Sequence, residues 1–203
     1  MNPSAHSRIV ALFDRHAGTL AVLCCAGTIF AFAAAFEPFS HRQHPVALLG
    51  ARGVPGAVAF NLLCFVVPGL LAAGVAVRLR ARLPAGAGRT AAIGVWMLAI
   101  SALAFAAQGL WPLDPADLEN ARSQRHATAW LLWWLSFAPG AVLLGLGVRS
   151  VQGWRSWAGL FITAGLLAIV LNALPATWLP GPIAQRVLLA LWLACVWGAS
   201  RRR

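Results

Sequence analysis

The stretch AVAFNLLCFVVPGLLAAGVAV, residues 57–77, decides the fold class. It is apolar except for Asn61, and it has the length of about 20 residues that a helix needs to cross a bilayer. A soluble globular domain carries about 25% charged residues, whereas this chain has 10% charged and 60% hydrophobic residues. The sequence therefore predicts an all-α membrane protein.

Five further apolar runs flank this stretch. The predicted transmembrane helices are 17–36, 57–77, 90–110, 127–148, 157–174 and 183–199. The connecting segments are short, so residues 1–203 form a single integral membrane domain with six spans. The first run follows a basic leader and has the alternative reading of a signal peptide, but its apolar stretch exceeds the about 7–15 residues of a signal core. A retained helix is favoured.

The arginines predict the orientation. The chain has no lysine, and its formal net charge is +11. With the N-terminus in the cytoplasm, eleven arginines are cytoplasmic and five lie outside, which satisfies the positive-inside rule. The eleven are Arg8, Arg15, Arg78, Arg80, Arg82, Arg89, Arg149, Arg155, Arg201, Arg202 and Arg203, and the five are Arg42, Arg52, Arg122, Arg125 and Arg186. Both termini are thus predicted to be cytoplasmic. Arginines scattered between apolar runs do not form the basic face of a nucleic-acid-binding protein, so no nucleic acid partner is expected.

The remaining polar residues gather on the predicted outer side. Four of the five acids fall there, as do His41, His44 and His126. Polar residues within the spans lie near the same ends of their helices, namely Asn61, Gln108, Asn172 and Gln185. Because a polar side chain in hydrocarbon is costly, such residues usually face a bundle interior or a wet cavity. Their shared depth predicts one polar pocket that opens outward.

The segment WPLDPADLENARSQRHATAW, residues 111–130, supplies most of the candidate site. Asp114 and Asp117 have a structural interpretation, in which Asp114 caps a short helix that begins at Pro115. His126 opens the fourth predicted helix and shares a face with Trp130. It is either an interfacial histidine beside an aromatic belt or a pocket residue paired with a loop carboxylate.

Three chemistries fit these residues. The first is a metal site around His41 and His44 of the HRQH segment, but Pro45 favours an extended backbone at His44, and no zinc signature is present. The second is acid–base hydrolysis or group transfer on a lipid, with His126, Asp114 and Asp117 as catalytic candidates and His44 as third member. The third is binding of an anionic headgroup by outer arginines, because arginine pairs bidentately with phosphate.

Two spans share a gapless pattern. PGLLAAGVAVR, residues 68–78, and PGAVLLGLGVR, residues 139–149, both begin with Pro-Gly, have a glycine five residues after that first glycine, and end at an arginine. The pattern indicates either a duplicated helical hairpin or convergent use of proline and glycine for kinks and close helix packing.

Three stretches resemble a known family. Residues 44–71, residues 109–130 and the Trp-Trp that follows are similar to a bacterial family of six-helix membrane proteins, domain-of-unknown-function family nine-nine-eight. By this resemblance, four residues correspond to positions that the family shares, namely Asn61, Asp114, Asp117 and His126. At Trp111, tryptophan stands where the family more usually has another aromatic residue. The resemblance implies six helices in a bacterial membrane, and it implies no reaction or cofactor.

The functional prediction follows from the polar pocket. We expect a multi-pass inner-membrane protein that binds a membrane lipid headgroup or small amphiphile, as a sensor, accessory subunit or carrier. The expected ligand-binding residues are Asn61, Asp114, Asp117, Arg122, His126 and Trp130. The alternatives are an intramembrane hydrolase or transferase, metal-assisted or not, and a small-molecule transporter. The absence of charged residues at mid-membrane in the sequence argues against an ion-coupled pump.

Overall fold

A computed structural model describes residues 5–201, and the described chain is helical throughout, without strands. Six helices are long and apolar enough to cross a membrane. They are α1 (Ala5–Ala35), the combined segment α2 (Ala57–Asn61), η2 (Leu62–Val66) and α3 (Val67–Ala81), then α4 (Gly88–Leu110), α5 (Ala121–Val148), α6 (Arg155–Ala173) and α7 (Gly181–Arg201). Two short 3₁₀ helices, η1 (Val46–Gly50) and η3 (Ala85–Ala87), lie in connections. The predicted all-α architecture with six spans is confirmed.

Two helices begin more than five residues before the start that the hydropathy pattern predicts. α5 begins at Ala121, because the side-chain oxygen of Asn120 accepts hydrogen bonds from the backbone N–H groups of Arg122 and Ser123, each at 2.9 Å. This is a regular N-cap, which satisfies donors that have no partner inside the helix. The added turn is polar, so an apolar window does not detect it. α1 likewise extends to Ala5 through a polar first part.

The second span contains a π-helical turn. η2 covers Leu62–Val66, directly before Pro68. Pro68 has no N–H to donate to the carbonyl four residues earlier, and its ring crowds that carbonyl. A wider turn accommodates this defect, and such π-bulges inside α-helices are frequent at functional sites. The expected mid-membrane irregularity at this proline therefore takes the form of a π turn.

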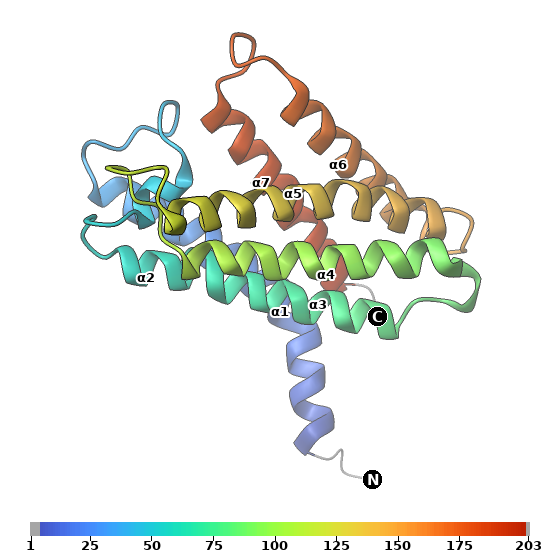
Figure 1. Cartoon of the computed structure of the whole chain (residues 1–203). Helices are drawn as coiled ribbons and strands as arrows, with labels where there is room; N and C mark the ends of the chain where they lie inside the picture. The colour runs from blue at the N-terminus through green and yellow to red at the C-terminus, as the bar shows by residue number, and fades with distance from the viewer. Residues whose placement is uncertain (1–4, 202–203) are drawn as a thin grey trace.

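α4 lies at the centre of the bundle. Figure 1 shows α3, α4 and α5 running side by side, with α1 and α7 crossing them at a steep angle and α6 rising from the end of α5. Figure 1 also shows the connections 36–56 and 111–120 at one end of the α3–α5 layer. We call this end, together with the adjoining start of α7, the loop end. The terminal end carries the 82–87 and 149–154 connections, the start of α1 and the end of α7.

Glycines let the helix backbones approach α4 from both sides. A Cβ atom on Gly69 of α3 would lie 2.6 Å from the backbone nitrogen of Ala106 in α4. A Cβ on Gly140 of α5 would lie 2.9 Å from the Cβ of Met97 in α4. Real Cβ atoms do not approach neighbours this closely, so only glycine fits at these contacts. Lipid tails are as apolar as the helix surfaces, so the hydrophobic effect does not drive transmembrane helices together. Close packing of small residues is therefore a main source of helix association.

The second glycine of each repeat faces a different neighbour. Gly74 of α3 packs against the ring of Phe13 in α1, and Gly145 of α5 packs against Ile162 in α6. A duplicated hairpin would place Gly140 against α6, in the same way as Gly69 lies against α4. Since Gly140 lies against α4 instead, the structure favours close packing over hairpin duplication as the origin of the shared pattern.

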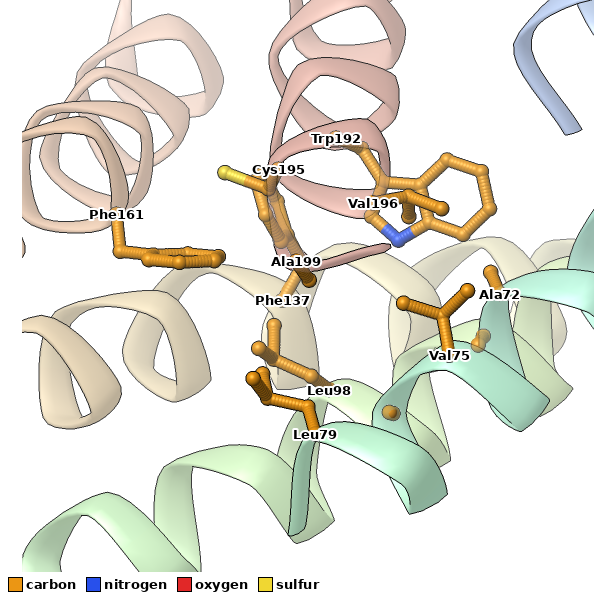
Figure 2. Close-up of a pocket in the computed structure, with 12 residues that line it drawn as sticks. Ala72, Val75, Leu79, Leu98, Phe137, Phe161, Trp192, Cys195, Val196 and Ala199 are labelled. Carbon is orange, nitrogen blue, oxygen red and sulfur yellow. The ribbon is translucent and has the colours of Figure 1, made fainter. Parts of the chain in front are cut away.

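Aromatic side chains form the centre of the bundle. The rings of Phe105 and Trp192 lie with centroids 4.5 Å apart, and Trp133 packs against both. Towards the terminal end, a cavity of about 20 Å³ remains between α3, α4, α5, α6 and α7 (Figure 2). Figure 2 shows that apolar side chains and the Cys195 thiol surround it. A cavity of this size holds about one water, and water needs several polar partners.

An ion-pair cluster closes the terminal end. Both carboxylate oxygens of Asp14 in α1 accept hydrogen bonds from the guanidinium of Arg78 in α3, at 3.0 Å each. Arg82 pairs with the same carboxylate. Through these contacts, Asp14 joins α1 to the arginine-rich end of α3. Arg202 and Arg203, which belong to the predicted cytoplasmic arginines, lie outside the described residues.

We predict that Gly94→Ala destabilises the protein, whereas Gly27→Ala does not. A Cβ on Gly94 in α4 would overlap the backbone nitrogen of Leu144 in α5, and backbone atoms cannot move aside as a flexible side chain can. A Cβ on Gly27 in α1 would meet nothing within 4 Å. Alanine has the higher helix propensity by about 0.8–1.0 kcal/mol, so Gly27→Ala is neutral or stabilising. Overpacking at Gly94 costs about 1–3 kcal/mol.

The measurement is the melting temperature of the purified protein in one mild detergent. We expect a lower melting temperature for Gly94→Ala and an unchanged or higher one for Gly27→Ala. Equal melting temperatures for the two variants would contradict close backbone packing between α4 and α5.

Candidate functional site

The connection between α1 and α2, residues 36–56, folds over the loop end of the bundle, and we call it the cap segment. Its 3₁₀ helix η1 is buried, with Leu49 and Ala51 fully enclosed. Buried backbone N–H and C=O groups that are not paired within a regular helix need other hydrogen-bond partners, because an unpaired buried group is costly. The cap segment therefore needs polar partners from the surrounding helices.

Asn61 is one of these partners. Its side-chain amide nitrogen donates a hydrogen bond of 2.7 Å to the carbonyl oxygen of Gly50, at the end of η1. Asn61 is 4% exposed, and a Cβ on Gly50 would overlap its amide. The glycine thus allows the close contact, and the asparagine ties the cap segment to the start of the second span.

Two neighbouring residues at the start of α7 hold the other part of the cap segment. The side-chain oxygen of Gln185 accepts a hydrogen bond of 3.0 Å from the backbone N–H of Val46. Arg186 donates to the carbonyl oxygens of His44 and Pro182 at 3.0 and 2.7 Å, and to the ring nitrogen Nδ1 of His41 at 3.3 Å. Its guanidinium also lies over the ring of Phe39. Arg186 thus joins α7 to the cap segment.

Arg52 connects the cap segment to the 111–120 connection. Its backbone N–H donates to the carbonyl of Leu113 at 2.8 Å, and its guanidinium pairs with the Asp114 carboxylate at 3.2 Å. The Arg52 side chain is 72% exposed and that of Asp114 is 14% exposed. An exposed pair of this kind is worth at most about 1 kcal/mol, so the backbone bond and the pair together fix register rather than supply large stability.

The two aspartates organise their own loop. Asp114 Oδ1 accepts from the N–H of Ala116 at 3.2 Å, and Asp117 Oδ1 accepts from the N–H of Glu119 at 3.1 Å. These are Asx turns, in which a side chain replaces a backbone partner. The helix that Asp114 was expected to cap is therefore absent from this stretch, and the next helix begins at Ala121 with Asn120 as its cap.

His126 caps the end of α4. Its ring nitrogen Nδ1 lies 3.1 Å from the carbonyl oxygen of Gln108 and 3.0 Å from that of Trp111. A ring nitrogen between two carbonyl oxygens must carry the proton and donate. The last carbonyls of a helix have no partner within it, and His126, only 7% exposed, supplies one. Among the described residues, no hydrogen bond joins His126 to Asp114 or Asp117.

The two histidines of the HRQH segment also serve the cap segment. His44 Nδ1 accepts a hydrogen bond of 2.9 Å from the N–H of Ser40, and His41 Nδ1 accepts from Arg186. Across residues 5–201, no group of three or more histidine, cysteine, aspartate or glutamate side chains is arranged to hold a metal ion.

Two of the pockets at the loop end are lined by predicted ligand-binding residues. The first, which we call the arginine groove, has a volume of about 390 Å³ and lies between the cap segment and the starts of α2 and α5. Arg52 and Arg122 line it together with Asn61 and mainly apolar groups. The guanidinium of Arg122 forms no ion pair with any described residue. The groove thus combines an unpaired cation with an apolar surface.

The second pocket lies between α5, α6 and α7, and we call it the amide pocket. It has a volume of about 230 Å³. Trp130, Asn172 and Gln185 line it, together with leucines and alanines of α6, α7 and their connection. Three residues that the sequence placed at the same depth therefore meet here, from three different helices.

The predicted site residues are thus divided between the two pockets. Asn61 and Arg122 line the arginine groove, and Trp130 lines the amide pocket. Asp114 borders the groove through its pair with Arg52, whereas Asp117 is exposed on the loop and His126 is buried at the end of α4. Gln108 is enclosed by protein, and its side-chain nitrogen has no partner among the described residues.

Sequence reasoning missed the structural role of Arg186 and the buried η1 turn. The sequence predicted only that Arg186 lies on the outer side. Its two hydrogen-bond partners in the cap segment, His41 and His44, lie 145 and 142 positions away in the sequence. For the η1 turn, the local signal in the sequence is Gly50, a glycine that follows an apolar stretch. A glycine alone does not identify Asn61 as the residue that contacts it.

These features define the chain as a multi-pass membrane protein, a six-span helical bundle whose loop end is closed by a buried cap segment. Residues 19–201 match the family described as "Protein of unknown function (DUF998)", and the chain belongs to that family. The predicted family resemblance is confirmed. No curated protein and no solved structure matches the chain.

Variants of His126 distinguish a structural histidine from a catalytic one. We predict that His126→Ala lowers the stability of the bundle by about 1–3 kcal/mol, because two buried carbonyls lose a donor. Asparagine carries an N–H donor at the same position as Nδ1, whereas glutamine carries its donor at the position of Nε2. His126→Asn should therefore restore most of the stability, and His126→Gln should restore little.

Thermal unfolding of the three variants in the same detergent is the measurement. Asparagine and glutamine variants that melt alike would contradict the capping role of Nδ1.

Proposed function

We propose that this membrane protein binds the headgroup of an anionic lipid or small amphiphile at its loop end, in the arginine groove. The observation that carries the proposal is the unpaired guanidinium of Arg122 beside Arg52, on a groove whose lining is otherwise mainly apolar. In this proposal, the protein acts as a sensor, an accessory subunit or a carrier, and it catalyses no reaction.

The charges of the groove favour an anion. Arg52 is partly neutralised by Asp114, while Arg122 has no acidic partner among the described residues. The groove therefore has a net positive charge, and a phosphate or carboxylate would form charge-assisted hydrogen bonds with the guanidinium. Arginine is suited to this task because its planar fork pairs bidentately with such groups.

The shape of the groove favours an amphiphile over a free ion. Val54, Ala57 and Val58 form part of its lining, and Val58 is 75% exposed. Exposed apolar groups next to a cation are complementary to a headgroup that continues into an acyl chain. The volume of about 390 Å³ falls within the range of about 300–1,000 Å³ that is usual for ligand pockets.

We further propose that the loop end faces away from the cytoplasm, in the inner membrane of a bacterium. The arginine bias supports this orientation, because the terminal end carries more than twice as many arginines as the loop end in the sequence. Positively charged short connections stay in the cytoplasm. The arginine groove would then meet lipids of the outer leaflet.

Charge reversal of Arg122 tests the binding proposal. We expect purified protein in mild detergent to retain phosphatidylglycerol in preference to phosphatidylcholine, as measured by native mass spectrometry. Arg122→Glu should weaken phosphatidylglycerol binding about tenfold or more, because charge-assisted hydrogen bonds are worth about 1.5–3 kcal/mol.

The matched control is Arg42→Glu. Arg42 is an exposed arginine of the cap segment, and it does not line the groove. Arg42→Glu changes the net charge of the loop end by the same amount as Arg122→Glu. Because Arg42 lies outside the groove, this control should leave lipid binding nearly unchanged. An equal loss in both variants would indicate general surface attraction, and the absence of any retained anionic lipid would refute the proposal.

Thiol labelling tests the orientation. Asp117 and Gln152 are exposed residues at opposite ends of the bundle. We predict that a membrane-impermeant maleimide labels Asp117→Cys in intact bacterial spheroplasts and labels Gln152→Cys only after lysis. The unmodified protein is the control, because its own cysteines lie within the helices. The reverse labelling pattern would invert the proposed topology.

A further inference from the structure

The amide pocket has polar groups from three helices directed to one small volume. Asn172 is the second-last residue of α6, Gln185 lies in the second turn of α7, and Trp130 belongs to α5. All three line the pocket of about 230 Å³. Figure 1 shows the tip of the α6–α7 hairpin standing away from the α3–α5 layer.

Backbone contacts fix which half of each amide faces the pocket. The side-chain nitrogen of Asn172 donates to the Ala168 carbonyl at 2.8 Å, so its oxygen is left as an acceptor. The side-chain oxygen of Gln185 accepts from the Val46 N–H at 3.0 Å, so its NH₂ group is left as a donor. A backbone partner removes the usual ambiguity between the two ends of an amide. The indole N–H of Trp130 has no partner among the described residues and is a second donor.

No charged side chain lines this pocket. The nearest arginine in the sequence, Arg186, directs its guanidinium to His41, His44 and Pro182. An ionised group would therefore be desolvated here without a counter-charge, which is costly. A group that both donates and accepts hydrogen bonds without carrying charge fits the donors and the acceptor that remain.

We propose that the amide pocket binds an uncharged, hydroxyl-bearing lipid headgroup, such as the glycerol of a monoacylglycerol. A hydroxyl donates to the Asn172 oxygen and accepts from the Gln185 NH₂ or the Trp130 N–H. The pocket is smaller than the about 300–1,000 Å³ that takes a drug-sized ligand, so it takes a headgroup and leaves the chain outside. The adjoining faces of α6 and α7 expose Leu167, Val170 and Val187, which suit an acyl chain.

This site is separate from the arginine groove, with which it shares no lining residue. The two sites also differ in the chemistry they select, since one presents cations and the other neutral donors and an acceptor. The protein would therefore have two lipid sites at its loop end, one for an anionic headgroup and one for a neutral headgroup.

Native mass spectrometry with monoolein and methyl oleate tests the proposal. Both probes carry the same acyl chain, but methyl oleate has no hydroxyl. We expect the unmodified protein to bind monoolein at least about tenfold more tightly than methyl oleate. Asn172→Leu and Trp130→Phe should each weaken monoolein binding about fivefold or more, as the loss of one hydrogen bond of about 1 kcal/mol implies.

The matched control is Gln124→Leu, which removes an exposed amide at the same end but outside the pocket. It should leave monoolein binding unchanged. Trp130→Phe keeps an aromatic ring next to Trp133, since the two ring centroids lie 4.9 Å apart. If Asn172→Leu fails to fold, Trp130→Phe alone tests whether the amide pocket binds monoolein.

Two results would overturn the proposal. One is equal binding of monoolein and methyl oleate, and the other is unchanged monoolein binding in both pocket variants. Arg122→Glu should leave monoolein binding intact, so failure of the arginine groove and failure of the amide pocket are distinguishable. A third result, loss of monoolein binding in Arg122→Glu but in neither pocket variant, would also overturn the proposal, because it would assign the glycerol to the arginine groove.

Discussion

Buried backbone groups that leave a helix must find partners within the protein, and this constraint explains most of the buried polar residues at the loop end. The cap segment carries non-helical backbone into the bundle, and α4 ends with unpaired carbonyls nearby. Asn61 serves the Gly50 carbonyl, Gln185 serves the Val46 N–H, and His126 serves the last carbonyls of α4. The rare polar side chains share one depth because the irregular backbone is concentrated there.

The same constraint separates the residues that build the fold from those that can bind a ligand. A side chain whose polar atoms are all bonded to backbone has nothing left to offer, whereas a half-bonded amide presents its other half. Asp114 is bonded to Arg52 and to the loop backbone, and His126 uses Nδ1 for α4, which leaves it only Nε2 as an acceptor. Asn172 and Gln185 each keep one free end. Ligand chemistry is therefore read from the atoms that remain after the backbone is satisfied.

The transmembrane helices could be predicted from the sequence because length and apolarity act locally. The run 57–77 became a span ending at Ala81, and the run 90–110 became α4 ending at Leu110. The start of α5 was missed because its first turn is polar, although Asn120 is a favoured capping residue. Helix ends depend on single hydrogen bonds, which average hydropathy does not resolve.

The candidate site was predicted only as far as its depth. The sequence grouped Asn61, His126 and Trp130 correctly at one end, but it gave no sign that they occupy separate environments. Gln185 is bonded to a residue 139 positions away, and Arg186 to one 142 positions away. Such partners are set by how the cap segment folds back on α7. No pattern within one helix contains that information.

The cap segment is also the element that the two pockets have in common. Arg52, Gly53 and Val54 of the cap segment line the arginine groove. Further along the same segment, the Val46 N–H holds the oxygen of Gln185 and thereby turns its NH₂ group into the amide pocket. A displacement of the cap segment would change the wall of one pocket and release a donor of the other. Asn61 and Arg186 anchor this segment, so they would preorganise both pockets for the ligands proposed above, which would lower the conformational cost of binding.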